Sequence, residues 1–190
     1  MNTPNKLTIF RVLLIPIILW LMYSSWEWSN LAALAVFLLA AVTDWLDGYI
    51  ARKKNLITTF GKFMDPLADK LLVTAVFIAL ADFGYLSGII AIIVISREFV
   101  VTGLRLVAVS EDKIIAANLW GKLKTVLQIS VIIAFFINSE LRGIIITYNH
   151  VILTTRILNW LIWIMTAVTV ISGIDYVWKN RALLKMGGNK

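Results

Sequence analysis

Four aspartates stand at the borders of apolar sequence, and their spacing groups them into two pairs. Asp44 and Asp47 are three positions apart, and Asp65 and Asp69 are four positions apart. Side chains at these spacings share one face of a helix. Carboxylates beside long apolar runs are costly, because they lose hydration and repel one another unless cations neutralise them. The pattern therefore predicts a metal site built between two helices.

The residues around these acids fit phosphate chemistry. Four carboxylates supply the oxygen ligands that Mg²⁺ or Mn²⁺ prefers, and two such ions can hold both sides of a displacement at phosphorus. Gly48 leaves space beside the backbone, and Arg52 can pair with phosphate oxygens. Gly61 would let the connecting loop bend over the site, and Asp65-Pro66 resembles a helix start. Among the acids, Asp69 is the candidate to accept a proton from an attacking hydroxyl.

The composition of the 190-residue chain indicates where this site lies. Hydrophobic residues make up 60% and charged residues 15%, whereas a soluble domain is about half apolar and about a quarter charged. The net charge of +7 suits anionic headgroups and phosphorylated substrates better than nucleic acid in so apolar a chain. We therefore expect an all-α membrane protein, with residues 1–190 as a single transmembrane domain.

Six apolar segments are expected to form the transmembrane helices. They run from about Leu7 to Tyr23, Leu31 to Ile50, Asp65 or Pro66 to Ala81, Leu86 to Val109, Leu119 to Ile137, and Ile157 to Trp178. With a cytoplasmic N-terminus, every lysine and arginine except Arg142 and Arg156 falls on the cytoplasmic side, as the positive-inside rule requires. The sequence thus predicts six helices in a single bundle of the cell membrane, with both termini and the four aspartates at the cytoplasmic face.

The motif in residues 44–69 resembles the signature of the CDP-alcohol phosphotransferase family. The matching positions are Asp44-x-x-Asp47-Gly48-x-x-Ala51-Arg52 and, after eight residues, Gly61-x-x-x-Asp65-x-x-x-Asp69. The resemblance implies an integral-membrane enzyme of six spans. Such an enzyme transfers a phosphatidyl or similar group from a CDP-activated lipid or alcohol to an acceptor hydroxyl and releases CMP. It also implies a homodimer.

The resemblance assigns roles to the motif residues. Two divalent ions would be bound by Asp44, Asp47, Asp65 and Asp69, and Asp69 would also act as the general base. The CDP-lipid would lie against Gly48, Arg52 and Gly61. Residues 4–11 (PNKLTIFR) resemble the N-terminal segment of bacterial phosphatidylglycerophosphate synthases, which lies near the nucleotide, so Asn5 and Thr8 are further candidates for this site.

Two later segments, residues 96–105 (SREFVVTGLR) and 121–128 (GKLKTVLQ), also resemble that subfamily. Arg97 and Arg105 are about two helical turns apart and lie on similar sides of one helix. Lys122 and Lys124 begin the next helix on the same membrane side, so the four could form a pocket for an acceptor phosphate. Glycerol 3-phosphate carries such a phosphate, whereas serine and choline do not. The prediction is therefore transfer from CDP-diacylglycerol to glycerol 3-phosphate, giving phosphatidylglycerophosphate and CMP.

Three other interpretations compete with this one. The acceptor could instead be phosphatidylglycerol, inositol phosphate or serine. The acids could line the path of a divalent-cation transporter, although they cluster at one membrane face and basic residues surround them. They could also be helix caps and loop salt bridges with Arg52, Lys53 and Lys62, although the fixed spacing of acids, glycines, alanine and arginine argues against this.

Overall fold

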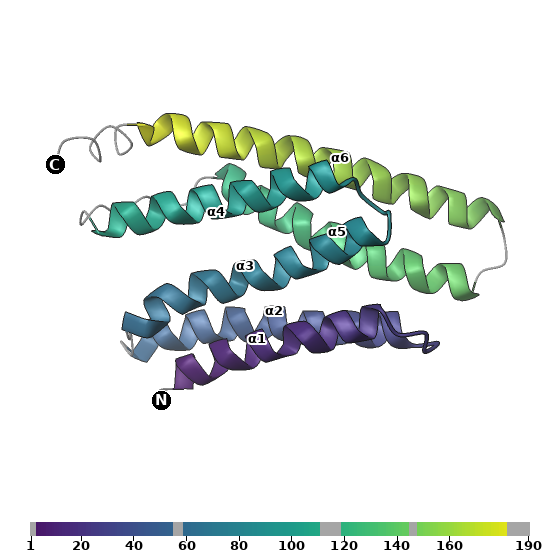
Figure 1. Ribbon diagram of the computed structural model, residues 1–190, viewed down its shortest axis with the longest axis horizontal. Helices are drawn as coiled ribbons and strands as arrows, with labels where there is room; N and C mark the ends of the chain where they lie inside the picture. The colour runs from purple at the N-terminus through teal and green to yellow at the C-terminus, as the bar shows by residue number, and fades with distance from the viewer. Residues whose placement is uncertain (1–2, 55–58, 111–118, 145–147, 182–190) are drawn as a thin grey trace.

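The computed structural model describes residues 3–54, 59–110, 119–144 and 148–181 (Figure 1). The side chains at 3–7, 44–54, 59–66, 69, 109–110, 141–144 and 148–151 lie outside that description. The described chain is helical and contains no strand, which confirms the all-α prediction. Its helices are α1 (Thr3–Met22), α2 (Ser29–Lys54), α3 (Thr59–Asp82), α4 (Gly88–Ser110), α5 (Leu119–Ile144) and α6 (Tyr148–Lys179).

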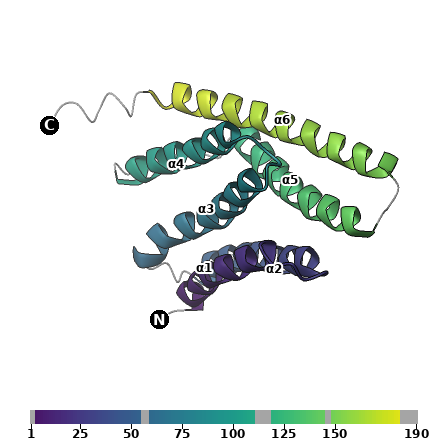
Figure 2. The ribbon, with the colours of Figure 1, turned by 45° about the vertical axis from the view of Figure 1, so that its right-hand side comes forward.

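The helices pack in two groups that α3 connects. On one side α1 lies along α2 and α3, and on the other α5 and α6 form an antiparallel pair (Figures 1 and 2). Between them, α4 contacts both α3 and α6, and α2 also contacts α5. The first helix begins and the last helix ends at the same end of the bundle (Figure 1).

Two described segments are long and apolar enough to cross a membrane. They are Leu119–Glu140 in α5 and Ile152–Lys179 in α6, and shorter apolar stretches occur at Thr8–Met22 and Ser29–Thr43. A crossing requires about 20 apolar residues. The number of spans and the orientation of the bundle stay predictions.

Two predicted helix starts are wrong. The third helix begins at Thr59 rather than at Asp65 or Pro66, so Pro66 does not start it and Gly61 lies inside the helix, not in a bending loop. A proline removes one backbone donor and disturbs a helix without always ending it, and Pro16 likewise lies inside α1.

The last helix begins at Tyr148, nine residues before the predicted Ile157. The predicted start was placed after the polar residues that precede Ile157, but the helix includes these residues. One of them, Thr154, donates a hydrogen bond to Oδ1 of Asn138 on α5 at 2.7 Å. A polar side chain with such a partner can lie between packed helices at little cost.

A tight turn sets the register of α3 against α4. Gly84 has a φ of +74°, and the amides of Gly84 and Tyr85 donate to the carbonyls of Ala81 and Leu80. This pattern is a Schellman motif, in which glycine tolerates the left-handed conformation. Ser87 then caps α4 by accepting a hydrogen bond from the amide of Ile90 at 3.3 Å.

Because the two helices run back from this turn, residues equally far from Gly84 lie at the same level. Lys70 precedes Gly84 by fourteen positions, and Glu98 follows it by fourteen. Their side chains meet across the interface, with Lys70 Nζ 3.7 Å from Glu98 Oε2. The turn therefore determines which residues of α3 and α4 face each other in the middle of the bundle.

The buried apolar core fills the half of the bundle that contains this turn. It includes Phe37, Val76, Phe77, Leu80, Ile132, Phe135, Phe136, Leu158 and Met165. Beyond the core, four helices carry polar side chains in the interior: α3 at Lys70, α4 at Arg97 and Glu98, α5 at Gln128 and Lys124, and α6 at Thr169 and Ser172. A smaller apolar cluster of Val101, Leu104 and Tyr176 follows on α4 and α6. Buried polar groups require partners. Thr169 donates to the carbonyl of Met165 in its own helix, and the other six residues provide partners for one another.

Candidate active site

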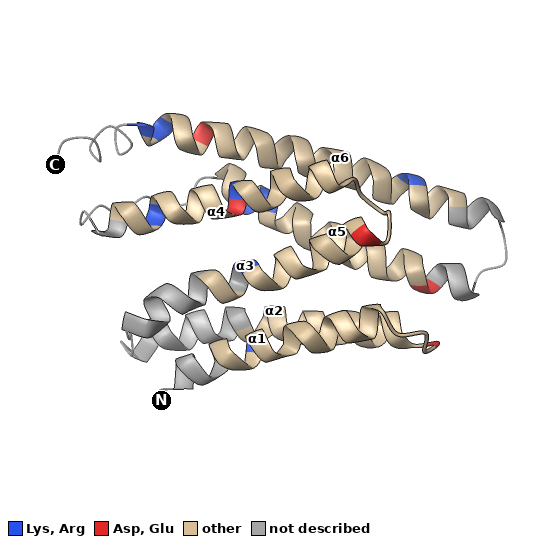
Figure 3. Ribbon diagram, in the orientation of Figure 1, with Lys and Arg blue, Asp and Glu red and all other residues tan. Residues whose placement is uncertain are grey.

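A basic cavity of about 380 Å³ opens beside this polar level. It is lined by residues of α3, α4 and α5, where lysines and arginines gather in the middle of the bundle (Figure 3). Arg97, Arg105, Lys122 and Lys124, the four predicted acceptor-binding residues, all line it. The structure therefore brings these residues together, while the ligand of the cavity stays a prediction.

Glu98 lies at the inner wall of the cavity and is 2% exposed. Its Oε1 accepts hydrogen bonds from the Lys124 ammonium and from Nε2 of Gln128, the latter at 3.1 Å. Lys124 Nζ also donates to Oε1 of Gln128 at 3.2 Å, which closes a triangle of three buried side chains. Lys70 Nζ lies 3.7 Å from Glu98 Oε2, and Arg97 Nη1 lies 4.0 Å from Oε1. One carboxylate thus faces cations from three helices.

Arg97 connects α4 to α6. Its Nη2 donates to Oγ of Ser172 at 2.6 Å. The aliphatic part of the side chain passes close to Gly173, where an added Cβ would lie 3.1 Å from Arg97 Cγ. Hydrogen bonding at the tip and close packing along the stem fix the direction of the guanidinium, which is a requirement for oriented phosphate recognition.

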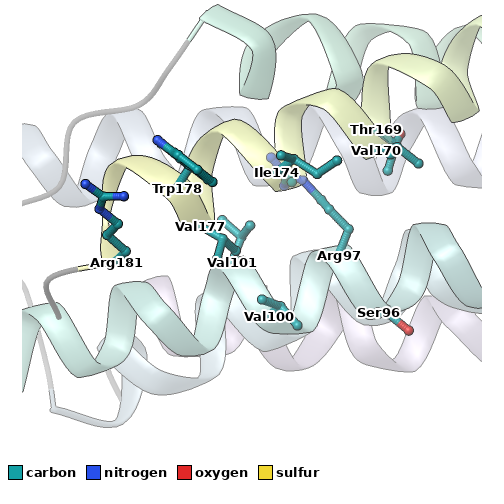
Figure 4. A pocket seen from close by; sticks show the side chains of 11 residues that line it. Ser96, Arg97, Val100, Val101, Thr169, Val170, Ile174, Val177, Trp178 and Arg181 are labelled. Atoms are coloured by element: carbon teal, nitrogen blue, oxygen red, sulfur yellow. The ribbon is translucent and has the colours of Figure 1, made fainter. Parts of the chain in front are cut away.

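Arg97 also borders a second cavity of about 440 Å³ between α4 and α6. Figure 4 shows Arg97 reaching from α4 toward α6 among the side chains that line it. The walls are mainly apolar and include Val100, Val101, Val170, Ile174 and Val177. Arg97 therefore separates an apolar groove from the basic cavity.

Glycine at position 173 should be important for stability. We expect Gly173→Ala to lower the free energy of unfolding by about 1–3 kcal/mol relative to Gly103→Ala, because the new methyl crowds a side chain anchored at Ser172. Gly103 is the matched control, since nothing lies within 4 Å of a Cβ built there. Both alanines gain the same helix propensity, so denaturation in detergent isolates the crowding. Equal stabilities would show that Arg97 is free to move.

Arg105 and Lys122 form the exposed side of the basic cavity. The Arg105 guanidinium lies over the ring of buried Tyr176, with Cζ 5.8 Å from the ring centroid. Such a cation–π contact restricts the arginine while its N–H groups remain able to donate. The cavity thus has cations held in place at its inner wall and accessible cations at its mouth.

The side chains of the four motif aspartates lie outside the described residues, so their predicted metal site stays a prediction. Asp44 and Asp47 belong to the second half of α2, and Asp65 and Asp69 to the first half of α3. These halves are joined through residues 55–58 and so lie at one end of the bundle (Figure 1). The donor set, four carboxylates without sulfur or nitrogen, fits Mg²⁺ or Mn²⁺. Gly48, Arg52, Gly61 and Asn5 also have no described side-chain environment.

Thr8 is the one predicted CDP-lipid residue whose side chain is described, and it is buried on α1. Arg11, one turn further along, is only 1% exposed and shares this face of the helix. Since α1 packs against α2 and α3, both side chains point into the group of helices that carries the aspartates. Sequence reasoning named Arg11 within the N-terminal resemblance but did not place it in the site.

Sequence reasoning also missed Lys70, Gln128 and Ser172, and it did not assign Glu98 to the site. Two signals could have found them. Glu98 is an acid within an apolar run, and Gln128 lies four positions after Lys124, the spacing at which helical side chains meet. Ser172 carries no such signal, because only the packing of α4 on α6 brings it to Arg97.

Comparison with known proteins identifies the family. A family model described as CDP-alcohol phosphatidyltransferase matches residues 1–174. The chain belongs to the CDP-alcohol phosphatidyltransferase family. This confirms the resemblance carried by the motif and makes the chain a phosphatidyltransferase. With the two apolar segments in α5 and α6, membership also indicates a membrane protein.

Two bacterial relatives of this phosphatidyltransferase span nearly its whole length, and a plant relative spans about two thirds of it. A protein of Bacillus subtilis (strain 168) named CDP-diacylglycerol–glycerol-3-phosphate 3-phosphatidyltransferase is 41% identical, over 97% of each chain. A Haemophilus influenzae protein of the same name is 38% identical over 93% of this chain and 91% of its own. A protein of Oryza sativa subsp. japonica named cardiolipin synthase (CMP-forming) is 40% identical over 68% of this chain and 44% of its own.

Proposed function

We propose that this phosphatidyltransferase transfers the phosphatidyl group of CDP-diacylglycerol to glycerol 3-phosphate, giving phosphatidylglycerophosphate and CMP. The names of the full-length relatives support this reaction. The alternative of a divalent-cation transporter is disfavoured by membership in a transferase family.

The observation that carries the proposal is the position of the basic cavity. Lys70, which follows Asp69 directly on α3, lines it together with Arg97, Arg105 and Lys122. A phosphate held by these cations would lie close to the last motif aspartate along the same helix. This supports an acceptor that carries both a phosphate and a reactive hydroxyl, as glycerol 3-phosphate does.

The proposed step is a single displacement at phosphorus. The acceptor hydroxyl oxygen forms a bond to the phosphorus that carries diacylglycerol, and the bond from that phosphorus to the CMP oxygen breaks. Asp69 accepts the hydroxyl proton, and CMP leaves with the bonding electron pair. Arg97, Arg105 and Lys122 bind the acceptor phosphate and orient its hydroxyl, which lowers the entropic cost of the reaction.

On the donor side, we assign the CDP-lipid to Asn5, Thr8, Gly48, Arg52 and Gly61. Arg52 would pair with pyrophosphate oxygens, and Gly48 would allow their close approach. The proposed metal ligands are Asp44, Asp47, Asp65 and Asp69. When bound, two Mg²⁺ or Mn²⁺ ions would supply electrostatic stabilisation of the pyrophosphate oxygens. The acyl chains would remain in the bilayer.

The proposed arrangement in the membrane has six spans with both termini cytoplasmic, in a homodimer. The shared end of the bundle at which α1 begins and α6 ends (Figure 1) and the concentration of basic residues in the middle of the bundle (Figure 3) support the placement of the termini. The homodimer follows from the family resemblance alone. A cytoplasmic cavity would receive a soluble acceptor and release CMP into water.

The purified protein tests the reaction directly. With CDP-diacylglycerol and Mg²⁺ or Mn²⁺, glycerol 3-phosphate should yield phosphatidylglycerophosphate and an equal amount of CMP, both identified by mass. Phosphatidylglycerol, inositol phosphate and serine should yield little product in parallel reactions. Faster product formation from any of these three would replace the proposed acceptor.

Phosphatidylglycerol is the second candidate acceptor, because the rice relative is named cardiolipin synthase. The rice protein covers less of this chain than the bacterial relatives do. The name of the rice protein therefore gives weaker support to an acceptor than the names of the bacterial proteins do. Comparing the rates with phosphatidylglycerol and with glycerol 3-phosphate distinguishes the two candidate acceptors.

Arg105→Ala should raise the KM for glycerol 3-phosphate about tenfold, because a charge-assisted hydrogen bond contributes about 1.5–3 kcal/mol. The KM for CDP-diacylglycerol should change less than about twofold, because Arg105 is assigned to the acceptor and makes no contact with the donor in this proposal. Steady-state kinetics with each substrate varied separately measures both. Arg156→Ala is the matched control, since this exposed arginine lies on α6 beside Trp160 and Trp163 and does not line the basic cavity. An effect confined to CDP-diacylglycerol would contradict the acceptor assignment.

A further inference from the structure

Among the side chains that the structure describes, five cations line the basic cavity and one carboxylate is buried among them. Lys70, Arg97, Arg105, Lys122 and Lys124 are the cations, and Glu98 is the acid. Glu98 forms ion pairs with three of these cations, which come from three different helices: Lys70 on α3, Arg97 on α4 and Lys124 on α5. Like charges this close repel strongly in a poorly hydrated site. The carboxylate of Glu98 therefore reduces the repulsion between the cations and allows them to lie close together.

The contacts also divide the cations into two kinds. Lys124 is 4% exposed and donates to both Glu98 and Gln128, so its donors are directed at the protein. Arg97 lies at the distance limit of an ion pair with Glu98 and is anchored by Ser172. Lys70 faces the second carboxylate oxygen at 3.7 Å while its side chain is about a quarter exposed. Glu98 thus holds Lys124 back and leaves Lys70 and Arg97 at the cavity wall.

We propose that Glu98 is a positioning residue: its carboxylate holds Lys124 in the protein interior and fixes Lys70 and Arg97 in the geometry that receives the acceptor phosphate. This rests on the proposed function, because it concerns how the same cavity binds its phosphorylated substrate. Glu98 itself touches neither the phosphate nor the reacting atoms. It acts through the cations that it orients.

Glu98→Gln is the decisive variant, because the amide keeps the size of the side chain and an oxygen that Lys124 can donate to. We expect the KM for glycerol 3-phosphate to rise about tenfold. The KM for CDP-diacylglycerol should stay within about twofold and kcat within about threefold, since a misplaced phosphate site weakens acceptor binding selectively. Glu140→Gln, on the same helix as Lys124 and outside the cavity lining, is the matched control and should behave as wild type. An unchanged or lower KM for the acceptor would overturn the proposal.

A double variant separates positioning from simple charge balance. Glu98→Gln leaves the buried Lys124 without its carboxylate, and adding Lys124→Met removes that uncompensated charge. We expect the double variant to keep the raised KM, because Lys70 and Arg97 still lack their common partner. Recovery of the wild-type KM would show that Glu98 only neutralises Lys124, which would overturn the proposal.

A binding measurement keeps this test separate from the reaction itself. Inorganic phosphate should raise the thermal unfolding temperature of the wild-type protein, and Glu98→Gln should require about tenfold more phosphate for the same shift. If the wild-type protein forms no phosphatidylglycerophosphate but shows this difference, the proposed acceptor fails and the role of Glu98 stands. Equal phosphate responses in the two proteins would overturn the role of Glu98, whatever the product.

Discussion

Replacing Asp69 with asparagine is expected to lower kcat by about 10³-fold or more, because an amide cannot accept the proton of the attacking hydroxyl. The same change removes a negative charge from the proposed metal ligands, which adds to the loss. The fold should persist, since asparagine has the size of aspartate. Release of CMP in the presence of both substrates measures the rate, and thermal unfolding in detergent measures the fold.

Asp82→Asn provides the matched control on the same helix. Asp82 lies thirteen positions after Asp69, beyond the apolar core, and accepts a hydrogen bond from the Tyr23 hydroxyl at 2.6 Å. Its kcat should stay within about twofold of wild type, because the chemistry of the site does not involve it. If Asp69→Asn instead regains near-normal activity at high Mn²⁺ concentration, Asp69 acts only as a metal ligand and the base assignment is wrong.

Replacing Arg97 with alanine should raise the KM for glycerol 3-phosphate by about 100-fold. This guanidinium would hold the acceptor phosphate, and a hydrogen-bonded charge contact of up to about 3 kcal/mol corresponds to a factor of roughly that size. The loss also leaves a gap between α4 and α6, where Arg97 now bonds Ser172 and packs on Gly173. We therefore expect a lower unfolding temperature as well as weaker acceptor binding.

Two further variants separate these effects. Arg97→Lys keeps the charge but loses the planar fork, and it should still raise the KM about tenfold. Ser172→Ala keeps the guanidinium and removes only its anchor. Its KM should rise about threefold, because the arginine can still bind the phosphate but is less firmly oriented. Kinetics with varied glycerol 3-phosphate compares the three. A Ser172→Ala effect as large as that of Arg97→Ala would show that the arginine acts structurally.

The helical class and the approximate centres of the helices could be predicted from hydropathy, because apolar runs of near-spanning length are a strong signal. The helix ends could not. Polar and proline residues at 65–66 and 154–156 predicted boundaries, yet α3 and α6 continue through these positions. Partners such as Asn138 for Thr154 come from a neighbouring helix, and no local pattern shows them.

The family could be predicted because its signature fixes both residue type and spacing within a short segment. The gathering of Arg97, Arg105, Lys122 and Lys124 around one cavity followed from helical periodicity and the short connection between their helices. Glu98 and Lys124 mark the limit of this reasoning. The sequence predicted that all four basic residues bind the acceptor phosphate. In the structure, the side chain of Lys124 instead donates hydrogen bonds to Glu98 and Gln128.

The turn at Gly84 makes the basic cavity sensitive to the number of residues in α3 and α4. Lys70 and Glu98 stand at equal distances from it along two antiparallel helices. Inserting one residue in either arm would rotate everything beyond it by about 100° and shift it by about 1.5 Å, so Lys70 would no longer face the carboxylate. An insertion or deletion between the turn and the basic cavity, on either α3 or α4, should therefore weaken the binding of the acceptor phosphate.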